Sequence, residues 1–217
     1  MKWKDKDMKK QNFIKKGMSL VDVIVAISIF SIGMAGFTVL FVRSWKSNSF
    51  IIEEGNTSLM ASRAIQNITN DLRKIKQADN GDFAIKSGDD FNLTVYLDED
   101  GDSVTERVHY YKTGQTLYKG ITNPNAGTPP TYPNGDQTVK TLAEYITNTE
   151  EQPLFYYYNK DYPGDTVNNP LNISPTLPVD QVKLIRVHLW INIKPLTAPD
   201  NINFETFIDL RNLNENI

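Results

Sequence analysis

An apolar run of 25 residues, from Met18 to Val42, constrains this chain more than any other feature. Its only ionisable side chain is Asp22. As a helix rising ~1.5 Å per residue, the run would be about 37 Å long, which is enough to cross a hydrocarbon core of ~30 Å. The sequence therefore predicts that residues 18–42 form a membrane-spanning helix.

The segment that precedes this run, residues 1–17, is basic. It carries seven lysines against two aspartates. Because basic flanks of a membrane helix stay in the cytoplasm, the rest of the chain should face the other side. We therefore expect a single-pass membrane protein with an extracytoplasmic C-terminal head.

Two common explanations of such an N-terminus fit incompletely. A secretory signal peptide has an apolar region of ~7–15 residues followed by a small-residue cleavage site, and the run here is longer and lacks a clear site. A plain membrane anchor fits the length but gives Asp22 no role. A carboxylate in lipid costs roughly 2.5–3.5 kcal/mol at the helix centre, and somewhat less near the interface.

A third interpretation comes from the segment KKGMSLVDVIVA, residues 15–26. It resembles the prepilin processing signature of the type IV pilin and type II secretion pseudopilin superfamily. Met18 stands where the family usually has phenylalanine, and Asp22 stands where it has glutamate. The residues that match the family pattern are Gly17, Ser19, Leu20 and Val21.

The resemblance implies a processing step and an assembly role. A prepilin peptidase would cut after Gly17 and methylate the new N-terminal residue, Met18, with Lys15 and Lys16 at the end of a basic leader. Asp22 would then be the assembly carboxylate, neutralising the new amine of its own or a neighbouring subunit. A buried charge is tolerated when it is paired, and the start of a helix favours an anion.

The function implied by the resemblance is structural. The chain would be a subunit, and more specifically a minor one, of a type IV pilus or type II secretion-like filament. Residues 18–42 would hold it in the membrane first and would pack in the filament core after extraction. Its partners would be other pilin or pseudopilin subunits, the prepilin peptidase and the inner membrane. The alternative is a single-pass, membrane-anchored surface module that binds a ligand and does not polymerise. The sequence does not decide which machine such a subunit serves.

Residues 43–80 are more polar but keep a helical period. Apolar residues recur there at spacings of three and four: Ala61, Ile65, Ile68, Leu72 and Ile75. This pattern predicts an amphipathic continuation of the helix. The residues Gly55–Thr57 are of types that can break or kink a helix, so the helix is either continuous or interrupted there. Residues 63–73 resemble the corresponding helix of the minor pseudopilin that caps type II secretion filaments, although any amphipathic helix has a similar pattern.

Residues 81–217 predict a β-rich globular head. Apolar residues alternate with polar ones in several segments, which is typical of half-buried strands. The expected strands are 91–97, 104–111, 116–119, 154–158, 185–193 and 202–210, and a short helix is expected over 139–146. The predicted fold class is α+β: a long N-terminal helix, membrane-spanning in its first half, packed on a head with an antiparallel β-sheet, as in pilins.

The turn between two of the expected strands and the start of the second strand carry four candidate metal ligands: Asp98, Asp100, Asp102 and Glu106. Alternating carboxylates at a tight turn can converge on Ca²⁺, which prefers 6–8 oxygen ligands. The spacing differs from that of an EF-hand loop, and an exposed acidic turn without a metal remains the alternative. Calcium is therefore a possible ligand, and no cofactor is required.

Other function classes find little support. The chain has no cysteine, which excludes disulfides, thiolate catalysis and zinc–thiolate sites. A formal net charge of −3 gives no indication of nucleic acid binding. His109 and His188 lie in expected strands without a nucleophile or metal motif beside them, so we do not expect an enzyme.

Overall fold

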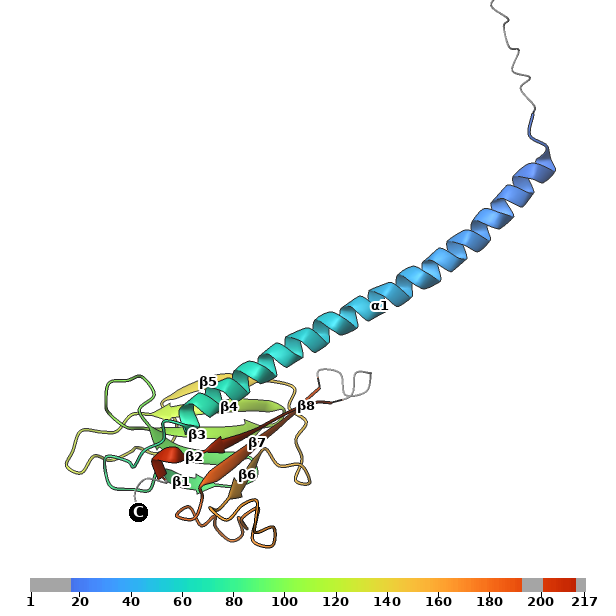
Figure 1. Ribbon diagram of the computed structural model, residues 1–217. Coiled ribbons are helices and arrows are strands. Elements are labelled where there is room, and N and C mark those ends of the chain that lie inside the picture. Colours follow the sequence, from blue (N-terminus) through green and yellow to red (C-terminus); the bar gives the residue numbers. More distant parts are fainter. Residues whose placement is uncertain (1–16, 193–200, 214–217) are drawn as a thin grey trace, which may run out of the picture. The chain divides into compact units, whose positions relative to one another are not determined.

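A computed structural model describes residues 17–192 and 201–213 of the chain (Figure 1). The chain divides into two compact units, Met1–Ser49 and Phe50–Ile217. Lys15 and Lys16, the basic end of the expected leader, lie outside the described residues.

A single α-helix, α1, runs from Leu20 to Leu72 and contributes to both units. The helix does not break near Gly55–Thr57, because it is continuous there. Thr57 Oγ1 donates to the carbonyl of Glu53 at 2.8 Å, so the hydroxyl is satisfied within the helix. One exposed glycine costs only about 1 kcal/mol relative to alanine, which a long helix tolerates.

In the first unit, every side chain of α1 from Leu20 to Ser49 is exposed. The hydroxyls of this stretch are nonetheless satisfied inside the helix: Ser28, Ser31 and Thr38 each donate to the carbonyl four residues earlier at 2.8 Å. Within the described part of the chain, α1 is the one helix long and apolar enough to cross a membrane. It is compatible with a single-pass membrane anchor.

The helix ends at Leu72, earlier than the expected boundary at residue 80. The amide of Lys74 donates to the carbonyl of Asp71 in a tight turn, at 2.9 Å. The amide of Lys76 then donates to the carbonyl of Tyr96 at 3.0 Å. The chain therefore leaves the helix because a strand offers its backbone a new partner.

The head contains a five-stranded antiparallel sheet in the order β1-β2-β3-β4-β5. Its strands are β1 Ile85–Gly88, β2 Asn92–Leu97, β3 Glu106–Thr113, β4 Thr116–Thr122 and β5 Thr138–Ala143. The expected strands 91–97 and 104–111 correspond to β2 and β3, and these two strands pair with each other as predicted. The sequence pattern did not predict β1.

The helix expected over 139–146 is wrong, because this segment begins with the edge strand β5. Val139 is 49% exposed, whereas Ala143 and Ile146 are buried in the core, so the apolar residues of this segment do not form one buried helical face. Thr138, Val139 and Thr141 are β-branched and favour an extended backbone. Pairing with β4 decides the outcome.

A second, three-stranded antiparallel sheet has the order β6-β7-β8. It consists of β6 Phe155–Tyr158, β7 Leu184–Ile191 and β8 Ile202–Asp209, followed by the 3₁₀ turn η1 Arg211–Leu213. These strands were predicted, but the pattern did not separate them into a sheet of their own. The last residue of the strand expected over 185–193 lies outside the described residues.

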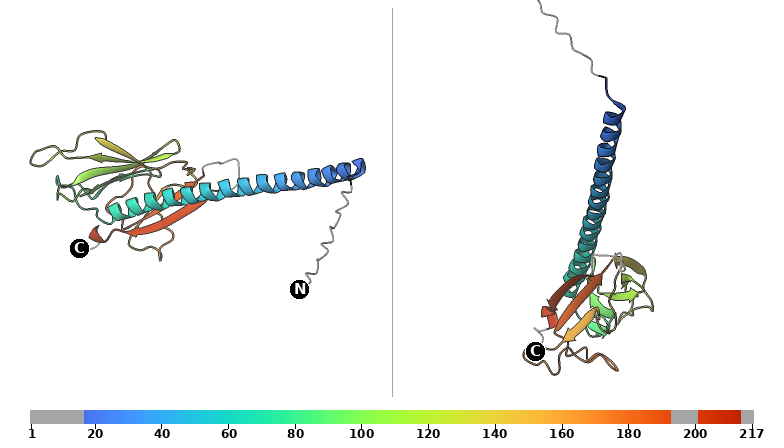
Figure 2. Two further views of the ribbon diagram at one scale, coloured as in Figure 1. Left: turned by 90° about the horizontal axis from the view of Figure 1, so that it is seen from above. Right: turned by 90° about the vertical axis from the view of Figure 1, so that its right-hand side faces the viewer.

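The hydrophobic core of the head lies where the end of α1 meets the two sheets (Figure 2). The fully buried helix residues are Ala61, Ala64, Ile68 and Leu72, and Ile75 follows in the next turn. Both sheets contribute to the same core cluster, for example Val95 and Val108 from one and Val187 and Leu189 from the other. The expected α+β architecture, a long apolar N-terminal helix packed against antiparallel sheets, is confirmed.

Candidate functional site

The first turn of α1 is organised by Asp22. One of its carboxylate oxygens, Oδ2, accepts a hydrogen bond from the backbone amide of Ser19 at 3.0 Å. The first four amides of a helix have no intrahelical acceptor, and a side chain three residues ahead can supply one. The carboxylate is therefore turned back toward the residues that precede the helix.

Those residues are the expected cleavage site, and they are accessible. Gly17 is exposed and has no neighbour within 4 Å of the position that a Cβ would take, and Met18 is 76% exposed. The Asp22 oxygen already contacts the amide of Ser19, which follows Met18 directly. The carboxylate therefore lies beside the residue that follows Met18.

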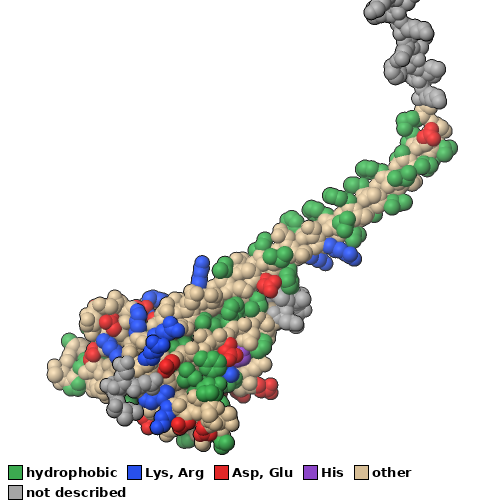
Figure 3. Space-filling model, in the orientation of Figure 1, with side chains coloured by type: hydrophobic (Ala, Val, Ile, Leu, Met, Phe, Trp, Pro, Cys, Tyr) green, Lys and Arg blue, Asp and Glu red, His purple; other side chains and the backbone are tan. Residues whose placement is uncertain are grey.

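Apolar side chains line the face of the helix that Figure 3 shows beyond this point, and the side chains of the whole run are exposed. Side chains spaced through the whole run are more than half exposed, including Ile24, Phe30, Phe37 and Phe41. A helix that is apolar on all sides needs lipid or protein around it. The single carboxylate and the apolar cylinder together form the candidate site of this chain.

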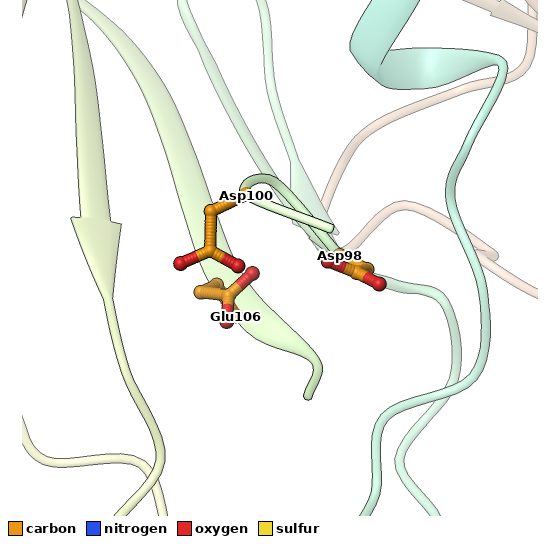
Figure 4. Close-up of side chains that lie close together, drawn as sticks. All are labelled: Asp98, Asp100 and Glu106. Atoms are coloured by element: carbon orange, nitrogen blue, oxygen red, sulfur yellow. The ribbon is translucent and has the colours of Figure 1, made fainter. Parts of the chain in front are cut away.

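The acidic turn brings three of its four predicted carboxylates together. Asp98, Asp100 and Glu106 each offer one oxygen, and these oxygens lie within 4.8 Å of one another (Figure 4). Asp102 is not part of the group, and its Oδ1 accepts the amide of Val104 at 2.7 Å. The arrangement is a potential cation site made of two turn residues and the first residue of β3.

Hydrogen bonds inside the turn account for these positions. Asp98 accepts the amides of Gly101 at 2.6 Å and Ser103 at 3.0 Å. Glu106 accepts the amide of Glu99 at 2.7 Å. Burial raises the pKa of Glu106, and the nearby carboxylates of Asp100, Asp102 and Asp98 raise it further. The calcium site stays a prediction, which a shift in thermal unfolding on adding millimolar Ca²⁺ would test.

A buried ionic cluster that the sequence did not indicate lies at the end of α1. Lys119 Nζ lies 2.6 Å from Asp71 Oδ2 and 3.0 Å from Glu99 Oε1. The hydroxyl of Tyr110 donates to the same Asp71 oxygen at 2.5 Å, and Lys140 contacts Glu99 at 3.2 Å. The alternation of residues in β4 could have indicated this cluster, because it places Lys119 on the same face as the buried Leu117 and Ile121.

The two histidines have different surroundings. His188 is 8% exposed, and burial lowers its pKa. His109 is more accessible, and its Nδ1 lies 3.3 Å from Asp136 Oδ2. The sequence did not indicate this partner, because Asp136 comes from a loop 27 residues further along the chain.

Comparison with known proteins assigns no family to the chain. No protein-family model matches it, and no curated protein is significantly similar to it.

Proposed function

We propose that this chain is a structural subunit, and a minor one, of a type IV pilus or type II secretion-like filament. Its leader would be removed by a prepilin peptidase after Gly17, and its C-terminal head would lie outside the cytoplasm. The observation that carries the proposal is the carboxylate of Asp22, which is turned toward the cleavage site at the start of an exposed apolar helix.

The carboxylate of Asp22 has an energetic cost in an apolar helix. An aspartate at the edge of an apolar helix is unfavourable for a protein that only needs an anchor. In a filament, apolar helices pack against one another, and a charge placed among them needs a partner. The amine created at Met18 would be such a partner, and the hydrogen bond from the amide of Ser19, the next residue, to Asp22 supports this pairing.

The hydroxyls of the apolar segment support burial in either lipid or a filament core. Ser28, Ser31 and Thr38 donate to their own helix, so none of them requires water or an external acceptor. The segment can therefore leave lipid and pack against the apolar segments of other subunits without losing a hydrogen bond.

Three variants test the role of Asp22 in native cells. Asp22→Ala removes the carboxylate, Asp22→Glu restores it with one more methylene, and Glu54→Ala removes an exposed carboxylate of α1 outside the apolar run. The measurement is the ratio of subunit in sheared surface filaments to subunit in membranes.

We expect Asp22→Ala to lower this ratio by about tenfold, which corresponds to roughly 1.4 kcal/mol of lost pairing. Membrane levels should stay unchanged, and the other two variants should assemble normally. The surface-module alternative predicts that Asp22→Ala inserts into the membrane as well as the parent or better. Normal incorporation of Asp22→Ala into filaments would contradict the proposed role.

A further inference from the structure

A polar pocket of about 330 Å³ opens on the face of the five-stranded sheet that is turned away from α1. Its floor is a row of side chains opposite one another on adjacent strands: Ser87 on β1, Thr94 on β2 and His109 on β3. Lys86 and Arg107 also line it, and Gly135 and Asp136 close one side. The pocket is therefore built from the sheet and one loop.

Arg107 is the most deeply placed charge in this pocket. The residue is only 7% exposed. Its Nη2 donates to Thr122 Oγ1 at 3.0 Å and to the carbonyl of Gly135 at 2.6 Å, and both of these acceptors are neutral. Among residues 17–192 and 201–213, no carboxylate lies within ion-pair distance of its guanidinium. A buried cation without an anion is costly.

The nearest acid of the pocket, Asp136, is committed elsewhere. Its Oδ2 lies 3.3 Å from His109 Nδ1. The carboxylate also lies directly over Gly120, where a Cβ would come within 2.1 Å of it. Gly120 therefore admits Asp136 above the sheet, beside the imidazole and outside ion-pair distance of the guanidinium.

The remaining lining groups are suited to an anion. Lys86 is exposed at the pocket and adds a second positive charge. The hydroxyls of Ser87 and Thr94 can donate hydrogen bonds. With Asp136 counted, the lining keeps an excess of positive charge. Guanidinium groups bind carboxylates and phosphates through two parallel N–H donors.

We propose that this pocket binds a small molecule that carries a carboxylate or a phosphate group. The oxyanion pairs with the guanidinium of Arg107 and the ammonium of Lys86, and hydroxyl donors of the sheet complete its shell. The volume is at the small end of the range for ligand pockets, about 300–1,000 Å³. The inference concerns the head and does not depend on polymerisation of the chain.

Isothermal titration calorimetry of the full chain in detergent tests this site. The probes are sodium phosphate, sodium acetate and sodium glucuronate, each against sodium chloride at equal ionic strength. The variants are Arg107→Gln and Lys86→Gln, and the matched control is Lys160→Gln, an exposed lysine outside the pocket. Phosphate and the two carboxylates distinguish the two sources of the oxyanion.

We expect at least one probe to bind at one site per chain with a Kd below about 10 mM. Arg107→Gln should abolish binding, Lys86→Gln should weaken it about tenfold, and Lys160→Gln should leave it unchanged. If Arg107→Gln does not fold, the comparison of Lys86→Gln with Lys160→Gln decides. The inference is overturned if no probe binds, or if these two lysine variants bind equally well.

Discussion

The ammonium of Lys119 lies 2.6 Å from the carboxylate of Asp71, and this ion pair joins the last turn of α1 to β4. The two residues are 5% and 8% exposed. Burial raises the pKa of Tyr110, whose hydroxyl stays protonated and donates to the same carboxylate. Because a buried charge must be paired, the cluster fixes which face of the helix end meets the sheet.

Removal of one member of this pair should destabilise the head strongly. We expect Lys119→Met to lower the free energy of unfolding by about 3–5 kcal/mol, because Asp71 is then a buried charge without a cation. Asp71→Leu should lower it by less, because Lys119 keeps its contact with Glu99 at 3.0 Å. The double variant should lose less free energy of unfolding than the sum of the two single losses, since no unpaired ion remains. Urea unfolding of the full chain in detergent measures all three values.

A neighbouring ion pair provides the control. Lys140 also contacts Glu99, at 3.2 Å, but its side chain is 53% exposed. Lys140→Met should therefore cost less than about 1 kcal/mol. Strictly additive effects of the Asp71 and Lys119 substitutions would contradict the assignment of a coupled pair.

The acidic turn should make stability depend on pH through Glu106. Its pKa is raised from the ordinary value of 4.5 by burial and by neighbouring carboxylates. The folded protein therefore holds this proton more tightly than the unfolded chain does. The resulting stability is complete below the ordinary pKa and is lost as the pH rises through the raised value.

Glu106→Gln should consequently be more stable than the parent at neutral pH, and the difference should shrink toward zero in acid. Glu99→Gln, in the same turn, should have the opposite effect on stability. Burial works against the charge of Glu99, but hydrogen bonds and charges from Lys119 and Lys140 outweigh it and lower the pKa. Its stabilisation is present above the ordinary pKa and is lost in acid, so this variant should be less stable at neutral pH. Denaturant unfolding across a pH series measures both.

Gly88, at the end of β1, should not tolerate a larger side chain. A Cβ there would lie 2.5 Å from the hydroxyl oxygen of Tyr157 and 2.9 Å from Leu177 Cδ2. That hydroxyl donates to the carbonyl of Asp89 at 2.9 Å and so links β6 to the five-stranded sheet. Gly88→Ala should destabilise the protein by about 1–3 kcal/mol, measured by urea unfolding.

Gly55→Ala is the matched glycine control. Nothing lies within 4 Å of a Cβ at this position in the middle of α1. The substitution should therefore stabilise the helix by up to about 1 kcal/mol. A loss of stability at residue 55 would contradict the continuous helix.

The sequence predicted those elements in which one local pattern agreed with the tertiary environment. Each of these elements shows one regular pattern of apolar residues. The patterns are the apolar run from Met18, the helix face of Ile68 and Leu72, and the alternation of Leu93, Val95 and Leu97. The structure places these residues in α1 and β2. Their patterns were long enough to be read without knowledge of their neighbours.

The misses have physical causes of a different kind. The residues of β5 fit both a helical and an extended pattern, and pairing with β4 decided between them. The pairs Asp71–Lys119 and His109–Asp136 join residues 48 and 27 positions apart, a separation that no local period encodes. For the acidic turn, the residues could be predicted from the pattern but their geometry could not, and Asp102 lies outside the group of three.

The intact mass of the protein purified from its native membranes tests the central claim most directly. The account predicts a chain that begins at Met18 and carries one added methyl group, and it predicts that Gly17→Val leaves the leader attached. A chain that still begins at Met1, or a cut at another position, would contradict processing as a prepilin and would favour the membrane-anchored surface module.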